Sequence, residues 1–525
     1  MKQIKATSKK RLSSKFHISE ILMDGNLLFL FIPILFLSIY PLISNFLFQS
    51  QQGTIQVVGF VLIFTVVSYM IVKAPLDCSQ IIFCTLIIGI ILRTAYAFYT
   101  PVYIRQHDVE SIDGFGHLGY IWNIFSNNRL PEHNQWQFYQ PPLHHILSAL
   151  WLKYLSFTGI SLDASLEGLS VLPLIYSSLT LVVSYKILKM FDLSKKSMTI
   201  AFGIIAFHPT FIILAGSINN DMLSIFLMLL AYMYILQWNR SCALKDIVFT
   251  AVALALAALT KISTLMLALP IGFIFLFKLF QRNKTKTSLQ LWSQYIIFAV
   301  ISIPIALSHS VYSYIRFEQA LGYVPLPGNE NSALFVGNYS FTDRFVKPFS
   351  PTFFSKVFPN AFEDYNLPEY IIKSSIFGEY SFGGKELMGT CLLIITVVII
   401  ALSLLAMITT AIHLIKNKTN IVPILSLYIL WITLMFSHVM FNINYPFGCT
   451  MDFRYIVPTI LVGAVSIGLF YDRVQSFNNI PLTPPSQSIM TSRKHMSTSM
   501  RFLGKFISVC TMAFCILSML FYMFG

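Results

Sequence analysis

The sequence predicts an all-α, polytopic membrane protein with about thirteen transmembrane helices. Hydrophobic residues make up 56% of its 525 residues and charged residues only 11%, whereas a soluble globular chain carries about 25% charged residues. The hydrophobic residues gather in runs of about 17–25 residues, which is the length that an α-helix needs to cross a bilayer. Most of the basic residues lie in the short segments between these runs, as expected for a chain threaded through a membrane.

The predicted transmembrane helices follow these apolar runs, and their approximate bounds are 27–48, 55–73, 79–97, 168–190, 199–216, 222–238, 247–261, 263–280, 291–309, 387–412, 421–441, 454–471 and 504–523. We expect three parts. Residues 1–78 hold a basic cytoplasmic N-terminus and two leading helices, residues 79–471 form the central transmembrane module, and residues 472–525 hold a cytoplasmic linker and the last helix.

Basic residues near membrane spans stay on the cytoplasmic side. The thirteen-helix arrangement places all the main basic groups on that side: Lys2, Lys5, Lys9, Lys10, Arg11, Lys15, Lys186, Lys189, Lys195, Lys196, Arg240, Lys245, Lys278, Arg282, Lys284, Lys286, Lys416, Lys418, Arg473, Arg493, Lys494, Arg501 and Lys505. One miscounted helix would move half of these groups to the other side, so their agreement supports the count. Two large outer loops result, 98–167 and 310–386.

Residues 143–157 form an apolar run that this orientation does not allow to cross the membrane. The run is short and amphipathic and follows Pro141 and Pro142. We predict a helix lying on the outer membrane surface, with one apolar face and one wet edge. In the alternative interpretation the run is a true span, and the basic loop at 186–196 would then face outward.

The net charge of +14 does not indicate nucleic-acid binding, because no basic patch with interleaved aromatic residues stands outside the spans. The seven cysteines contain no CxxC pair, so neither a disulfide framework nor a cysteine zinc site is indicated.

The first long polar interruption runs from Arg105 to Leu147 and concentrates acids, histidines, aromatic residues and a Pro-Pro pair. Lipid-facing segments have no reason to carry such groups. A carboxylate just above the membrane can act as a general base. Asp108 is the preferred candidate because it clusters with His107 and His117. Glu110 and Asp113 compete with it, and any of these acids could instead be a solvated loop residue.

Three further polar features lie at the predicted outer ends of spans. Asn220 and Asp221 form a tight turn in which Asp221 either caps the next helix or faces the acid of the first loop. Lys261 interrupts about thirty apolar residues, and it is either a snorkelling anchor or a phosphate ligand. Arg454 begins a span and either pairs with Asp452 or offers its planar fork to phosphate oxygens. Such a site would suit a substrate with a lipid tail, a phosphate and a polar head.

In order and spacing, four segments resemble the GT-C superfamily of membrane glycosyltransferases, which includes protein O-mannosyltransferases and lipid A aminoarabinose transferases. They are FYQPPLHH, HPTFIILAGSINNDM, ALAALTK and DFRYIVP, and the resemblance covers roughly residues 79–471. It implies a helical fold with juxtamembrane helices in the first outer loop. It also implies transfer of a sugar from a polyprenyl-phosphate carrier, usually with inversion, with a first-loop Asp as base.

Carried over by position, the resemblance makes Asp108 the base and places Lys261 and Arg454 near the carrier phosphate, while Asp221 matches the acid of the second outer loop. Many relatives carry adjacent Asp and Glu directly before the His of the first loop. Here the order is Asp113-Gly114-Phe115-Gly116-His117. The identity of the base therefore stays open between Asp108 and Asp113, with Asp108 preferred.

The predicted function is therefore transfer of a sugar from a polyprenyl-phosphate donor to a glycan, lipid or protein acceptor, on the outer face of a bacterial plasma membrane. The predicted catalytic residues are Asp108, Asp113 and His117, and the predicted substrate and carrier-phosphate ligands are Lys261, Arg454, Tyr455, Asp221, Asn220, His107 and Gln140. No cofactor is certain, and Asp108 and Asp221 are candidate ligands for a divalent cation. The competing functions are a polysaccharide ligase or polymerase and a lipid-linked sugar transporter or flippase.

Overall fold

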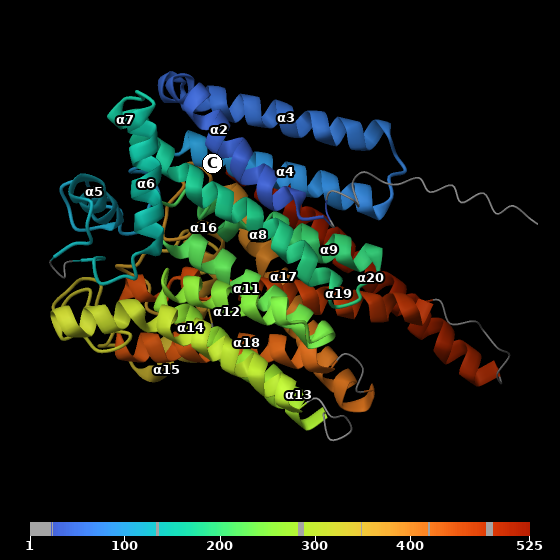
Figure 1. Ribbon diagram of the computed structural model, residues 1–525. Helices are drawn as coiled ribbons and strands as arrows, with labels where there is room; N and C mark the ends of the chain where they lie inside the picture. The colour runs from blue at the N-terminus through green and yellow to red at the C-terminus, as the bar shows by residue number, and fades with distance from the viewer. Residues whose placement is uncertain are drawn as a thin grey trace, which may run out of the picture.

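The chain folds into a bundle of helices (Figure 1). The computed structural model describes residues 23, 25–132, 136–281, 288–347, 349–417, 421–478 and 487–524. Within these ranges the regular structure is helical, apart from one isolated bridge between Phe335 and Phe447. The predicted all-α fold class is therefore confirmed.

The α-helices are α2 (Leu27–Gln49), α3 (Gln52–Val72), α4 (Cys78–Tyr99), α5 (His117–Asn127), α6 (Leu143–Phe157), α7 (Leu162–Glu167), α8 (Val171–Lys189), α9 (Lys195–Ala206), α10 (Pro209–Ile213), α11 (Asp221–Ser241), α12 (Leu244–Ala258), α13 (Ala268–Gln281), α14 (Ser288–Phe317), α15 (Phe341–Phe345), α16 (Leu367–Phe377), α17 (Glu386–Asn417), α18 (Ile421–Asn444), α19 (Thr459–Asn478) and α20 (Gln487–Phe524). Four 3₁₀ helices join them: η1 (Gly168–Ser170), η2 (Ile262–Leu267), η3 (Gly448–Met451) and η4 (Phe453–Tyr455).

Among the described residues, 10 helices are long and apolar enough to cross a membrane, and each overlaps a predicted span. The other three predicted spans form weaker candidates. The run 199–216 is broken between α9 and α10, the run 247–261 forms the 15-residue α12, and the run 454–471 is shifted into α19, which ends in polar residues. The number thirteen thus stays a prediction. Helix α20 begins at Gln487, inside the segment expected to be a linker.

Helices α5, α6 and α7 gather at one end of the bundle, and α6 lies across the direction of the long helices (Figure 1). Helix α6 is absent from the ten membrane-spanning candidates of the described chain. Its N-terminus is tied to the core, because Leu143 N donates to Leu259 O at 3.0 Å. This arrangement agrees with a surface helix in the first outer loop.

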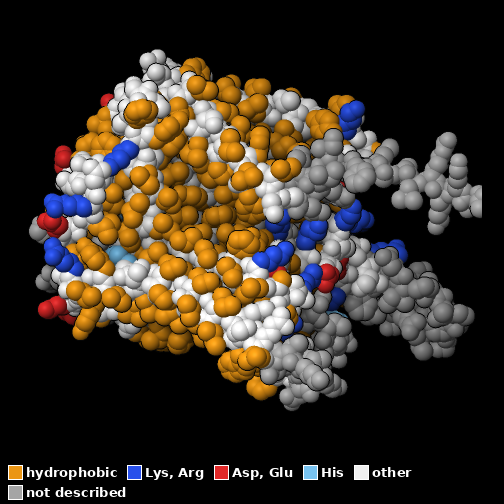
Figure 2. Space-filling model, in the orientation of Figure 1, with side chains coloured by type: hydrophobic (Ala, Val, Ile, Leu, Met, Phe, Trp, Pro, Cys, Tyr) orange, Lys and Arg blue, Asp and Glu red, His pale blue; other side chains and the backbone are white. Residues whose placement is uncertain are grey.

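The opposite end of the bundle carries basic residues of several loops (Figure 2). Arg240 donates to Met190 O and lies 3.3 Å from Asp192. Nearby, Ser197 in the first turn of α9 donates from its Oγ to Asp472 of α19 at 2.5 Å. These contacts place the segment 190–197, Arg240 and Asp472 at the same end of the bundle. The basic groups at 2–15, 282–286, 416–418 and 493–494 lie outside the residues whose side chains are described.

The break between α9 and α10 is held by Arg93, whose side chain is fully buried. Its Nη1 donates to Ala206 O, the last carbonyl of α9, at 2.7 Å, and its Nε donates to Ser177 Oγ at 2.9 Å. Ser177 in turn donates to Phe211 O in α10 at 2.7 Å. A helix end inside apolar surroundings needs such partners. Arg93 therefore fixes the segment that leads to Asp221.

Replacing Arg93 by Met should lower the thermal stability of the purified protein. The loss should be about 1–3 kcal/mol for each acceptor left without a donor, beginning with Ala206 O. The measurement is the midpoint of thermal unfolding in detergent, with Arg129→Met as the control because Arg129 is exposed and forms an exposed ion pair with Glu132. Equal midpoints for the two variants would contradict this role.

Candidate active site

The backbone around Asp108 is held by a close approach of α5. His117 N donates to Asp108 O at 2.8 Å, and Leu118 N donates to Val109 O at 3.1 Å. A Cβ atom on Gly116 would lie 2.4 Å from Asp108 O, so only glycine fits there. Asp108 itself has a φ of 51°, a left-handed conformation that Asp tolerates better than most residues. Gly116 therefore allows this docking of α5 on the Asp108 loop.

The turn that precedes α11 packs against the same loop. Gln106 accepts a hydrogen bond from Ile218 N at 2.9 Å and donates to Gly216 O at 2.8 Å. Asn219 bonds both the backbone and the side chain of Asp221 at 3.0 Å. Asn220 donates to Thr260 O at 2.7 Å, and this contact joins the turn to the segment that carries Lys261. The asparagines thus position the turn, and Asp221 is 1% exposed.

Four charged side chains from four segments form one network. Lys261 Nζ donates to Asp221 Oδ1. Arg454 bridges two acids, with Nη1 at 3.6 Å from Asp221 Oδ2 and Nη2 at 3.3 Å from Asp108 Oδ2. The buried Asp221 therefore contacts both cations, whereas the Asp108 side chain is 28% exposed.

Tyr455 lies between the two cations. The Lys261 nitrogen is 4.9 Å and the Arg454 guanidinium 5.1 Å from the centre of its ring. Burial alone would lower the pKa of Arg454, but the neighbouring Tyr455, Asp108 and Asp221 raise it well above its ordinary value. Arg454 thus carries a full charge that is directed at the site.

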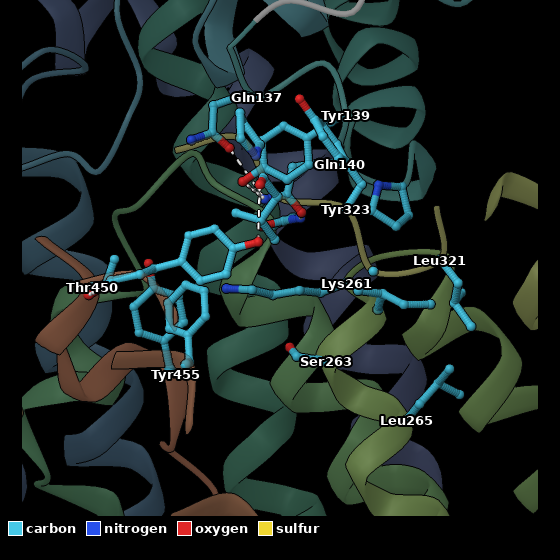
Figure 3. Close-up of a pocket in the computed structure, with 18 of the residues that line it drawn as sticks. Gln137, Tyr139, Gln140, Lys261, Ser263, Leu265, Leu321, Tyr323, Thr450 and Tyr455 are labelled. Atoms are coloured by element: carbon cyan, nitrogen blue, oxygen red, sulfur yellow. Dashed lines mark hydrogen bonds between the residues drawn. The ribbon is translucent and has the colours of Figure 1, made fainter. Parts of the chain in front are cut away.

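The network opens into a cavity of about 440 Å³. Figure 3 shows Lys261 reaching across it, with Gln140 and Tyr139 on one side and Tyr455 on the other. Its polar lining includes Asp108, His117, Gln137, Tyr139, Gln140, Asn220, Lys261, His309, Arg454 and Tyr455. Its apolar lining includes Ile262, Leu265, Met266, Leu321, Val324, Leu434 and Phe441. The cavity can therefore take a molecule with a charged part and an apolar part.

Several predicted residues meet here. Asn220 lies 3.3 Å from Gln140 Oε1, and both line the cavity. His117 also lines it and stacks on His145, with 2.9 Å between their ring nitrogens. The pKa of His117 lies well below its ordinary value, mainly because the ring is buried and secondly because His144 is close. This histidine is therefore neutral at pH 7.

Two predicted residues lie elsewhere. Asp113 is exposed and is not among the lining residues of the cavity. His107 is buried behind the site, 3.3 Å from Glu379 and 3.8 Å from Asp452. The predicted metal pair of Asp108 and Asp221 is engaged by Arg454 and Lys261, so this pair does not fit a divalent cation without displacing those side chains.

Other residues of the site were not predicted. Glu379 follows α16 in the long segment between α14 and α17, and residues 319–325 of that segment line the cavity. This segment is rich in aromatic residues and contains several other acids, and no local pattern distinguishes these positions from their neighbours. A signal existed only for Asp452, which stands two residues before Arg454 and accepts from Arg454 N at 2.9 Å.

Residues 139–320 match the family model described as dolichyl-phosphate-mannose-protein mannosyltransferase. This match confirms, for that segment, the resemblance that the motifs suggested. The segment contains the 143–157 helix, Asp221 and Lys261, whereas Asp108 and Arg454 lie outside it. No curated protein matches the chain.

Three solved structures illustrate the range of similar folds. The archaeal oligosaccharyltransferase AglB from Archaeoglobus fulgidus is 12% identical at a TM-score of 0.48, over 85% of this chain and 56% of that one. ArnT from Cupriavidus metallidurans is 12% identical at a TM-score of 0.45, over 84% and 75%. The Pmt1–Pmt2 protein O-mannosyltransferase complex of S. cerevisiae is 16% identical at 0.35, over 50% and 36%. This chain thus spans little more than half the length of AglB.

Proposed function

We propose that this protein, whose residues 139–320 match the mannosyltransferase model, is a glycosyltransferase that moves a sugar from a polyprenyl-phosphate donor to an acceptor. The observation that carries the proposal is the meeting of Asp108, Lys261 and Arg454 around one cavity that also has an apolar side. Transfer of a sugar from such a donor requires a base for the acceptor, cations for the phosphate and an apolar surface for the lipid tail.

The donor phosphate would bind between Lys261 and Arg454. Both side chains reach the cavity, and both are already held there by Asp221. Negative charge develops on the carrier phosphate as the bond to the sugar breaks, and fixed cations stabilise it in a site of low dielectric. The polyprenyl tail would lie along Leu265, Met266 and Leu434.

Asp108 would take the proton of the acceptor hydroxyl or amine as it attacks the anomeric carbon. Its carboxylate is partly exposed to the cavity, on the same side as Arg454. Attack from the face opposite the leaving phosphate inverts the configuration of the anomeric carbon. Gln140 and Asn220, whose side chains line the cavity, would bind the sugar hydroxyls.

The site would face the outside of a bacterial plasma membrane. This orientation rests on the basic loops, which gather at the end of the bundle that carries Arg240 and Asp472, away from the site. The acceptor is a glycan, lipid or protein of the cell envelope.

The proposal is tested with the full-length protein in proteoliposomes that contain a radiolabelled polyprenyl-phosphate sugar. Transfer or release of the sugar with free polyprenyl phosphate as the second product supports it. Translocation of the intact donor without release would show a flippase instead. Activity restricted to a diphosphate-linked oligosaccharide would show a ligase. Mass spectrometry of envelope glycans from a deletion strain and from an Asp108→Asn strain then identifies the acceptor.

Replacing Lys261 by Ala should weaken donor binding rather than abolish the chemical step. One charge-assisted hydrogen bond is worth about 1.5–3 kcal/mol, which predicts an apparent affinity lower by roughly 10- to 100-fold. The measurement is KM for the donor, with Lys356→Ala as control because Lys356 is exposed on the outer loop and pairs with Glu363. An unchanged KM in the Lys261 variant would remove this residue from the phosphate site.

A further inference from the structure

Three side chains that could bind a metal meet behind the cavity. His107 comes from the first outer loop, Glu379 follows α16, and Asp452 lies between η3 and η4. One ligand atom from each lies within 4.8 Å of the others. His107 Nδ1 is 3.3 Å from Glu379 Oε2, and its Nε2 is 3.8 Å from Asp452 Oδ2.

Two carboxylate oxygens of this group have no hydrogen-bond partner although they are buried. They are Asp452 Oδ2 and Glu379 Oε1. Asp452 is 1% exposed, and its Oδ2 points into the group, since it lies near the ring of His107. A buried carboxylate oxygen without a hydrogen-bond partner is destabilising, because burial removes the water that would otherwise bond it. Its burial here indicates a missing positive partner.

The nearest fixed cation does not supply that partner. Arg454 Nε lies 3.9 Å from Asp452 Oδ2, which is beyond hydrogen-bond distance, and the same guanidinium serves Asp108 and Asp221. These contacts link two cations, Lys261 and Arg454, to four carboxylates. The carboxylates are those of Asp108, Asp221, Glu379 and Asp452. With a neutral His107 the excess is two negative charges, the charge that one divalent ion neutralises.

One imidazole and two carboxylates are a donor set for Zn²⁺ or Mn²⁺ rather than for Mg²⁺ or Ca²⁺, which prefer oxygen ligands alone. Metal–ligand bonds of ~2.0–2.2 Å place tetrahedral ligand atoms about 3.4 Å apart. His107 would offer one of its two ring nitrogens. Because the three ligand atoms lie within 4.8 Å of one another, the side chains would have to close by up to about 1.4 Å around the ion.

We propose that His107, Glu379 and Asp452 bind one Zn²⁺ or Mn²⁺ ion. The ion would join the first outer loop to the segment after α16 and to the segment before α19. It would hold His107 directly beside Asp108, and Asp452 two residues before Arg454, so its role is to position the base and the arginine. Three protein ligands leave at least one position for water.

The test uses the full-length protein in detergent after treatment with EDTA. Titration calorimetry and metal analysis after dialysis should show one equivalent of Zn²⁺ or Mn²⁺ bound, and no comparable uptake of Mg²⁺. Glu379→Gln should lower that affinity by roughly 100-fold or more, because loss of a direct ligand should exceed the 10- to 100-fold cost of losing a supporting residue. Glu386→Gln, an exposed acid on α17, should bind as the unmodified chain does.

A second measurement needs no variant. EDTA should lower the unfolding midpoint of the unmodified protein, and Zn²⁺ or Mn²⁺ should restore it. Folded protein without saturable uptake would overturn the proposal and would favour a proton shared by Asp452 and Glu379 across His107. Equal uptake by the Glu379 variant would overturn it as well. No donor sugar is present, so the outcome is independent of the proposed transferase activity.

Discussion

Asp108→Asn should abolish sugar transfer while leaving the fold and the binding of the carrier nearly intact. The amide keeps the shape of the side chain but cannot accept the acceptor's proton. Positioned general bases contribute roughly 10²- to 10⁴-fold to rate, so kcat should fall by that factor. Asp108 is partly exposed and is one of three acids within 4 Å of Arg454, so replacing its carboxylate should disturb the network little.

The measurement is single-turnover transfer from the labelled donor, together with carrier affinity and the unfolding midpoint. The matched variant is Asp113→Asn, five residues along the same loop. Asp113 is exposed and outside the cavity lining, so its variant should retain activity. If Asp108→Asn kept full activity and Asp113→Asn were inactive, the base would be Asp113 instead of Asp108.

The choice between these two acids shows what the sequence could predict. Lys261 and Arg454 are charges beside long apolar runs, and the cost of placing them there makes each visible on its own, whereas Asp108 is preferred because it clusters with His107 and His117. Which of them meet is a tertiary property. Gly116 illustrates the limit, because its need for a close approach to Asp108 O follows from the docking of α5 and not from the local pattern.

The same reasoning explains the residues that were missed. Glu379 lies 272 positions from His107, its contact in the fold, in a loop with several other acids. The helices were easier to predict, because apolar length has a direct physical meaning in a bilayer. Where a span contains a break, as at Phe207 between α9 and α10, apolar content alone does not show it. The candidate metal pair of Asp108 and Asp221 stays a prediction, and sequence alone does not reveal that both acids already have cationic partners.

Asp221→Asn should have the largest effect on stability. Asp221 is the buried acid that Lys261 and Arg454 share, and removing one partner of a buried ion pair costs about 3–5 kcal/mol. The unfolding midpoint should fall accordingly. Asp192→Asn is the control, since Asp192 also pairs with an arginine but is 59% exposed, and exposed pairs are worth about 0–1 kcal/mol.

Carrier phosphate should partly rescue the Asp221 variant. If Asp221 holds two cations for an incoming phosphate, then the phosphate can supply the missing negative charge once it binds. Ligands that bind the folded state raise its stability in proportion to their affinity and concentration. Polyprenyl phosphate should therefore raise the unfolding midpoint of Asp221→Asn more than that of the unmodified protein. In transfer assays KM for the donor should rise while part of kcat is kept. An equal rise of the two midpoints would mean that Asp221 stabilises the turn before α11 without preparing the phosphate site.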